Sequence, residues 1–161
     1  MSNEDICCPE FNTAVWDEKT VTWEDKLFVR ETIPQIMHMP LPGAFGKAVG
    51  KMWAEIEKAG AKVETKDFLM LAQDPSPWKS NLHINVTKEV PGLDNVKISG
   101  TFMTKVFDGP FQDVPRFIKE METYVADKGE SILDYYFYYT YCPKCAVKYG
   151  HNYIVIFAKI K

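Results

Sequence analysis

The chain has 161 residues, of which 46% are hydrophobic and 25% charged, and its formal net charge is −3. These values predict a globular protein of one domain or two small modules, and the mild negative charge argues against nucleic acid as a partner. No apolar stretch has the roughly 20 residues of a membrane-spanning helix, and residues 1–10 carry acids where a signal peptide has basic and apolar regions. We therefore expect a cytoplasmic protein without a membrane partner, in which cysteines stay reduced.

Residues 1–32 are predicted to form an N-terminal arm followed by a short hairpin. Trp16 is the bulky residue of the arm and is expected to anchor it to the rest of the protein. Alternating residues at 20–23 and the segment at 27–31 predict two strands, which a turn at residues 24–26 would join.

The next part of the chain predicts a strand, a helix and two further strands. The first strand is expected at residues 33–39, and the helix from about Ala44 to Ala59, where apolar residues recur at spacings of three and four. Gly60 would end the helix, because glycine adopts the left-handed cap conformation without strain. The two strands that follow are expected at residues 68–73 and 82–87.

The same order of elements then recurs. A strand is predicted at residues 98–107, and a helix follows up to about Asp127, with Pro115 in its first turn, where proline is tolerated. Gly129 would end this helix, and the last two strands are expected at residues 133–141 and 153–160.

The first strand and turn of the two series match at one spacing, which pairs Met37 with Met103 and Gly43 with Gly109, and the later glycine and proline match at a spacing about two or three residues longer. We interpret this as an internal duplication. The predicted fold class is α+β: two β-α-β-β modules, about residues 33–90 and 98–161, related by a pseudo-twofold axis. They would share an antiparallel sheet of eight or nearly eight strands with two helices. A cleft between such modules is a common place for a ligand pocket.

An aromatic run is the most unusual part of the sequence. Residues 135–141 contain five tyrosines and Phe137, and aromatic residues favour strands. Alternation along a strand would place Tyr135, Phe137, Tyr139 and Tyr141 on one face. The run ends at Cys-Pro-Lys-Cys, where Pro143 is expected to turn the chain.

This series of elements resembles the GyrI-like small-molecule-binding family, which includes the effector-binding domains of multidrug-responsive transcription activators. The resemblance covers about residues 33–160. It rests on strands that end in Gly-Ala-Phe or Gly-Pro-Phe before a helix and on later strands that end near a proline. It implies a central cleft for flat, apolar and often cationic molecules. The Cys-Cys-Pro-Glu-Phe and Cys-Pro-Lys-Cys-Ala segments resemble a stand-alone branch of the family, in which some members hydrolyse reactive cyclopropane-bearing compounds.

One position departs from the family pattern Glu-x-Tyr-x-x-x-Pro of the penultimate strand. Counting back from Pro143, Tyr139 keeps the tyrosine, but Phe137 stands at the glutamate position. The departure puts in doubt both the pairing of a carboxylate with a cation and general acid–base chemistry. The leading function is therefore a binding protein for flat apolar or cationic aromatic molecules. A hydrolase of strained rings and an effector-sensing module that reports to another protein are the alternatives, so the sequence leaves enzymatic activity open.

The predicted binding site has an aromatic floor and walls from other parts of the chain. The floor would be Phe137, Tyr139 and Tyr141, and the walls Met37, His38 and Trp78. No catalytic residue is assigned.

The remaining candidates for chemistry give no clear site. His83 and His151 belong to no recognisable catalytic group, and without a glycine-rich phosphate loop the sequence implies no cofactor. A zinc site, reduced thiols and a disulfide are all open for the cysteines, with His151 as a further zinc ligand, and reduced thiols are favoured. The cysteines concerned are Cys7, Cys8, Cys142 and Cys145. A monomer and a homodimer are both open.

Overall fold

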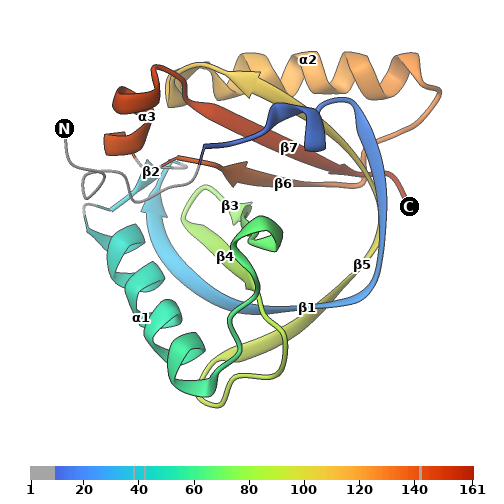
Figure 1. Ribbon diagram of the computed structural model, residues 1–161. Coiled ribbons are helices and arrows are strands. Elements are labelled where there is room, and N and C mark those ends of the chain that lie inside the picture. The colour runs from blue at the N-terminus through green and yellow to red at the C-terminus, as the bar shows by residue number, and fades with distance from the viewer. Residues whose placement is uncertain (1–9, 38, 42, 142) are drawn as a thin grey trace. The chain divides into compact units, whose positions relative to one another are not determined.

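The computed structural model describes residues 10–161 except residues 38, 42 and 142 (Figure 1). The fold is α+β with antiparallel strand pairs, as the sequence predicts. The chain divides into two compact units. Unit 1 contains the described residues up to Thr22 together with Gly100–Lys161, and unit 2 is Trp23–Ser99. Two long strands, β1 (Lys19–Ile36) and β5 (Asp94–Asp108), each have residues in both units.

Unit 2 contains most of β1, β2 (Met39–Pro40), helix α1 (Ala44–Ala59), β3 (Met70–Ser76) and β4 (Lys79–Asn85). Strand β4 pairs antiparallel with both β1 and β3, so that Ile84 lies opposite Val29 and Met70. Helix α1 has the predicted bounds, and Gly60 caps it with φ +64°. Its buried stripe at spacings of four is Ala48, Met52 and Ile56.

The predicted hairpin near the N-terminus is wrong, because β1 runs without interruption through residues 24–26. Asp25 adopts φ +50°, a left-handed conformation that aspartate tolerates better than most residues. Its backbone N–H donates to the Ser99 hydroxyl at 2.8 Å. The polar triplet therefore distorts one long strand and does not separate two. Strands β3 and β4 also extend further than predicted, up to a tight turn at Pro77 and Trp78.

Unit 1 contains most of β5, the helix α2 (Val114–Asp127), β6 (Asp134–Tyr139), the short helix α3 (Pro143–Tyr149) and β7 (Tyr153–Lys159). Two single turns of 3-10 helix, η2 (Thr13–Val15) and η4 (Phe111–Asp113), belong to the same unit. Strand β7 lies between β5 and β6 and pairs antiparallel with both, so that Val155 lies opposite Val106 and Tyr138. Pro115 occupies the first turn of α2 as predicted.

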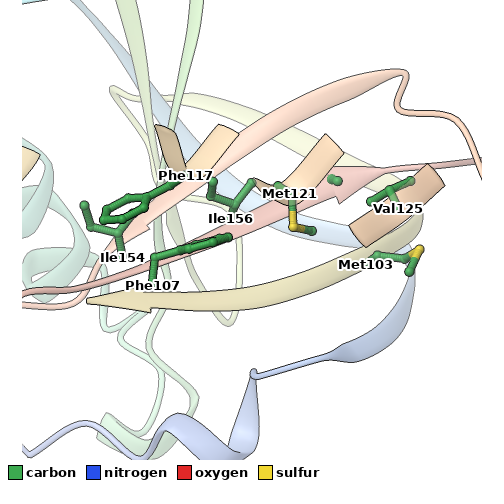
Figure 2. Close-up of a cluster of buried hydrophobic side chains, with 8 residues drawn as sticks. Met103, Phe107, Phe117, Met121, Val125, Ile154 and Ile156 are labelled. Atoms are coloured by element: carbon green, nitrogen blue, oxygen red, sulfur yellow. The ribbon is translucent and has the colours of Figure 1, made fainter. Parts of the chain in front are cut away.

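Helix α2 packs against one face of the β5–β7–β6 sheet and forms the core of unit 1 (Figure 2). The rings of Phe107 and Phe117 stack at 4.9 Å and 20°. Met121 is fully buried beside them. Burying a side chain of this size stabilises the fold by about 1.5–3 kcal/mol. The core consists of Met103, Phe107, Phe117, Met121, Val125, Ile154, Ile156 and Ala158.

Two details of the fold differ from the prediction. Pro143 is the first residue of α3 and does not begin a simple turn. Proline is compatible with this, because its fixed φ suits the first turn of a helix. The described residues form seven strands and three α-helices, where the sequence predicted eight or nearly eight strands and two helices.

Candidate functional site

A segment at residues 10–18, here called the arm, lies against the face of the unit 1 sheet that α2 does not cover. The Trp16 ring is 5.0 Å from that of Phe157, and the Trp16 carbonyl accepts a hydrogen bond from the Thr104 hydroxyl. The backbone N–H of Val106 donates to the Asp17 carboxylate at 3.1 Å. The predicted anchoring of the arm by Trp16 is confirmed. We call this face the arm-side face, and the opposite one the helix-side face.

Phe11, at the start of the arm, inserts among tyrosines of the arm-side face. Its ring centroid is 6.0 Å from that of Tyr138 in an edge-to-face arrangement at 85°, and 5.7 Å from that of Tyr153. Its backbone N–H donates to the Tyr141 hydroxyl at 2.7 Å. Edge-to-face and tilted ring pairs at these distances are favourable geometries.

The rings continue beyond Phe11. Tyr141 stacks on Tyr149 of α3 at 4.7 Å and 21°, and its ring is 5.9 Å from that of Tyr153. The His151 ring in turn stacks on the Tyr153 ring at 4.9 Å and 12°. These side chains form what we call the aromatic cluster, whose members are Phe11, Tyr138, Tyr141, Tyr149, His151 and Tyr153.

Strand register and one short helix bring the cluster together. Tyr153 lies opposite Asp108 in the β5–β7 pair, so both side chains point to the arm-side face. Tyr138 points to the same face, because it lies opposite Val155 and alternates with Tyr139. Helix α3 then returns the chain from the end of β6 to the start of β7, and Gly150 completes the turn with φ +73°.

A hollow of about 350 Å³ opens beside the cluster. This volume is at the small end of the range for ligand sites, about 300–1,000 Å³. Its lining consists of Glu10, Phe11, Asn12, Thr13 and Tyr153. The hollow thus lies between the first residues of the arm and the start of β7.

An acid–histidine pair stands at the edge of the cluster. The Nδ1 atom of His151 lies 2.7 Å from Asp108 Oδ2, and the Asn152 backbone N–H donates to Asp108 Oδ1 at 2.9 Å. Burial alone would raise the pKa of Asp108. The hydrogen bonds from His151 and Asn152 favour the ionised form and together lower this pKa below its ordinary value. An ionised carboxylate only accepts, so Nδ1 carries the proton and Nε2 is left as the basic atom of the ring.

The family of the chain follows from its sequence. A protein-family model described as "Bacterial hydrolase" matches residues 1–160. The chain belongs to this bacterial hydrolase family. No curated protein matches the sequence.

Solved structures share the fold of this bacterial hydrolase family member at low sequence identity. The C-terminal domain of EcmrR has a TM-score of 0.68 and 12% identity, over 91% of this chain and 98% of that one. A hydrolase from Listeria innocua has a TM-score of 0.60 and 9% identity, over 90% and 92%. SAV2435 bound to tetraphenylphosphonium has a TM-score of 0.50 and 11% identity, over 90% and 94%.

The sequence-predicted floor of the site is divided between the two faces. Phe137 and Tyr139 lie on the helix-side face, where they pack against the core of unit 1. Their rings stack at 6.5 Å, and Tyr139 also contacts Phe111 at 6.0 Å. Tyr141 lies past the end of β6, where strand alternation no longer applies, and joins the aromatic cluster. In this bacterial hydrolase family member, therefore, only one of the three floor residues meets the cluster.

Two of the predicted wall residues, Met37 and Trp78, belong to unit 2. Met37 follows β1 with φ +49° and is 66% exposed, and Trp78 is 57% exposed in the turn between β3 and β4. His38 lies outside the described residues. The role of these three side chains in a site stays a prediction.

Unit 2 has a hollow of its own, of about 390 Å³. Its lining combines both signs of charge with short apolar side chains, and we assign it no ligand. The lining consists of Lys26, Leu27, Val63, Glu64, Asp67, Asn85, Val86 and Thr87.

Of the four cysteines, the structure describes the side chain of Cys145 alone, which is fully buried. The other three, Cys7, Cys8 and Cys142, lie outside the described residues. Across the described ranges, no three histidine, cysteine, aspartate or glutamate residues are grouped so that they could hold a metal ion. No helix in the part of the chain that the structure describes is long and apolar enough to cross a membrane.

Sequence reasoning missed two features of the site. Phe11 was expected only as part of an arm, because nothing in a local pattern shows which face an arm will cover. The pairing of Asp108 with His151 had a usable signal: one residue ends β5 and the other precedes β7, and antiparallel pairing brings those two ends together.

Proposed function

We propose that this protein binds flat aromatic small molecules, cationic ones included, at the aromatic cluster. The observation that carries the proposal is the group of tyrosines around Phe11 beside a hollow of about 350 Å³. A tyrosine offers an apolar face for stacking and a polar hydroxyl at its edge. The cluster therefore suits molecules that are flat, mostly apolar and equipped with one or two polar atoms.

The cluster also has the electrostatic character that a cation requires. Each tyrosine face attracts a cation by about 0.5–2 kcal/mol, depending on its exposure. Phe137, which stands at the glutamate position of the GyrI-like pattern, lies on the helix-side face, so this position supplies no charge to the cluster. We therefore expect modest affinity, with binding distributed over several rings.

The likeness of the fold to the C-terminal domain of EcmrR supports the finer proposal of a GyrI-like ligand-binding domain. The order of elements supports the proposed duplication. A long strand, a helix and an antiparallel strand pair occur in unit 2 as β1, α1, β3 and β4, and in unit 1 as β5, α2, β6 and β7. Unit 1 differs from unit 2 by the additional helix α3.

A titration with tetraphenylphosphonium, a cation with four phenyl rings arranged tetrahedrally around phosphorus, tests whether aromatic cations bind at the cluster. Tyr153→Ala should raise the Kd by about 5- to 30-fold, which corresponds to about 1–2 kcal/mol from one aromatic contact and one cation–π contact. The control is Leu133→Ala. Leu133 is 65% exposed and lies just before the first residue of β6, whereas Tyr138 of the cluster lies near the last. Equal Kd values for the wild type and Tyr153→Ala would remove the cluster as the site.

A second candidate function is hydrolysis of a strained ring at the same place, and membership of the bacterial hydrolase family favours it. The chemistry would start from His151, which Asp108 orients at 2.7 Å. His151 Nε2 would take a proton from water, and the hydroxide would form a C–O bond to a carbon of an activated cyclopropane. The ring C–C bond breaks as its electron pair moves to the conjugated acceptor group, which takes the proton back from His151. The net reaction adds one water across one C–C bond.

Mass spectrometry distinguishes binding from hydrolysis. Incubation with an activated cyclopropane should give a product heavier by one water, and His151→Gln should reduce its rate by about 100-fold or more, the usual contribution of a general base. Tetraphenylphosphonium should still bind His151→Gln, with a loss no greater than that of one ring contact, about 0.5–1.5 kcal/mol. An unchanged rate in this variant would exclude His151 as the base, and no adduct with the wild type would exclude this reaction.

A further inference from the structure

We propose that Phe11 is a built-in occupant of the ligand subsite, and that the subsite selects aromatic amines whose nitrogen stands two carbons from the ring. The inference rests on the proposed binding function and names both the ligand class and the regulation of the site. It derives from what the arm places among Tyr138, Tyr141 and Tyr153.

The contacts of Phe11 are those of a small ligand. Its ring is edge-on to Tyr138 at 6.0 Å and tilted against Tyr153 at 5.7 Å, so two tyrosines hold one phenyl group. Its own backbone N–H is the donor to the Tyr141 hydroxyl at 2.7 Å. In phenylalanine this nitrogen is joined to the ring through two carbons, the Cα and the Cβ. The subsite therefore recognises a phenyl ring and an N–H donor at a fixed separation.

The same fragment, released from the chain, is a 2-arylethylamine. Its ammonium group provides three N–H donors where Phe11 provides one, and a hydroxyl oxygen accepts a hydrogen bond more strongly from a charged donor. The faces of the surrounding tyrosines also attract the positive charge. A carboxylate in place of the amine could only accept a hydrogen bond from the Tyr141 O–H, and the same faces would repel its negative charge.

Phe11 can leave the subsite without release of the whole arm. The later part of the arm is held separately by the Trp16 ring on Phe157 and by the Val106 N–H to Asp17 at 3.1 Å. Between the two attachments lies η2, whose first turn is stabilised by the Asn12 side chain, which accepts from the Ala14 N–H at 3.0 Å. The arm thus has one attachment at Trp16–Asp17 and another at Phe11.

This arrangement makes Phe11 an intramolecular competitor. The attachment at Trp16 keeps Phe11 at a high effective concentration near the subsite. A ligand then binds only the fraction of molecules in which Phe11 is out, and its apparent Kd rises by the inverse of that fraction. If Phe11 is in place nine-tenths of the time, the apparent affinity is tenfold weaker than that of the open subsite.

Calorimetric titration of the full chain with 2-phenylethylamine tests the proposal. Phe11→Ala should bind the amine about tenfold or more tightly than the wild type. Val15→Ala is the matched control in the same arm, since Val15 is 54% exposed, and it should leave the Kd unchanged. Phenylacetate should bind neither form measurably. Hydrogen exchange gives a second readout: the Phe11 amide should exchange faster when the amine is bound, while the Val106 amide keeps its protection.

The outcomes separate this inference from the function on which it rests. If tetraphenylphosphonium binds at the cluster but Phe11→Ala binds the amine as weakly as the wild type, or more weakly, Phe11 is a wall of the site and the inference is overturned. Equal binding of phenylacetate and the amine by Phe11→Ala would overturn the selectivity. If neither form binds tetraphenylphosphonium or the amine, the proposed function fails and the inference with it.

Discussion

Tyr138 and Tyr139 are neighbours on β6 whose side chains point to opposite faces, so alanine substitutions at the two positions separate ligand binding from core packing. The geometry favours Tyr138 as a ligand contact, because Tyr138 touches Phe11 on the arm-side face. The sequence-based prediction favours Tyr139. A direct comparison of the two variants decides between these readings.

The two substitutions should affect different quantities, the Kd of the ligand for Tyr138→Ala and the free energy of unfolding for Tyr139→Ala. Tyr138→Ala removes one aromatic contact, about 0.5–1.5 kcal/mol, and one cation–π contact, about 0.5–1 kcal/mol, from a bound cation. The Kd for tetraphenylphosphonium should therefore rise about 5- to 70-fold. Tyr139→Ala removes a half-buried ring that packs against Phe111 and Phe137. Full burial of such a ring is worth about 3–5 kcal/mol, so a half-buried one should cost about 1–2 kcal/mol of unfolding free energy.

Fluorescence titration and thermal unfolding measure the two effects on the same samples. Tyr139→Ala should lower the Tm by about 2–8 °C and leave the Kd within about twofold of the wild type. Both substitutions should also be made in the Phe11→Ala background, because loss of Tyr138 weakens the hold on Phe11 and partly offsets the loss of ligand contact. If Tyr139→Ala abolished binding while Tyr138→Ala kept it, the site would lie on the helix-side face and our reasoning would be refuted.

Three further predictions concern titration and packing. Burial, followed by the hydrogen bond and the charge of Glu122, raises the pKa of Tyr135 to about 12. The contribution of Tyr135 to the free energy of unfolding is therefore complete below about pH 10 and is lost as the pH rises toward 12. Phenolate absorbance should show a late step that Tyr135→Phe lacks. The pKa of Asp108 is lowered, so its contribution is present above about pH 4 and lost as the pH falls through the folded pKa; Asp108→Asn should flatten this acid limb of the stability curve, and an unchanged limb would contradict the assignment. Met121→Ala should cost about 2–5 kcal/mol of unfolding free energy because Met121 is fully buried in the core of unit 1, whereas Val147→Ala, at a residue 83% exposed, should stay within about 0.5 kcal/mol.

Periodic patterns predicted the regular elements well. The helix at Ala44–Ala59 was predicted with the bounds that the structure shows, because its apolar spacing and its glycine stop agree. The aromatic run was correctly predicted as a strand, β6. The polar triplet around Asp25 misled the prediction, because the same residues can bend one strand or join two. The start of α3 was missed for a similar reason, since Pro143 is compatible with a turn and with the first turn of a helix.

The site was less predictable than the fold. Alternation correctly placed Phe137 and Tyr139 on one face of β6, but it could not show that α2 covers that face. Tyr141 was grouped with them because the strand was extended two residues too far. Phe11 contacts Tyr138 and Tyr153 across more than a hundred residues of sequence, and no local pattern contains such a contact. Long-range placement of the arm is therefore what the structure adds.

A crystal structure of the protein soaked with tetraphenylphosphonium tests the central claim most directly. We predict density for a phenyl ring in contact with Tyr138 and Tyr153, with Phe11 moved out of its place. Density for the ligand against Phe137 and Tyr139, or its absence from the aromatic cluster under conditions where binding is measured in solution, would contradict the claim.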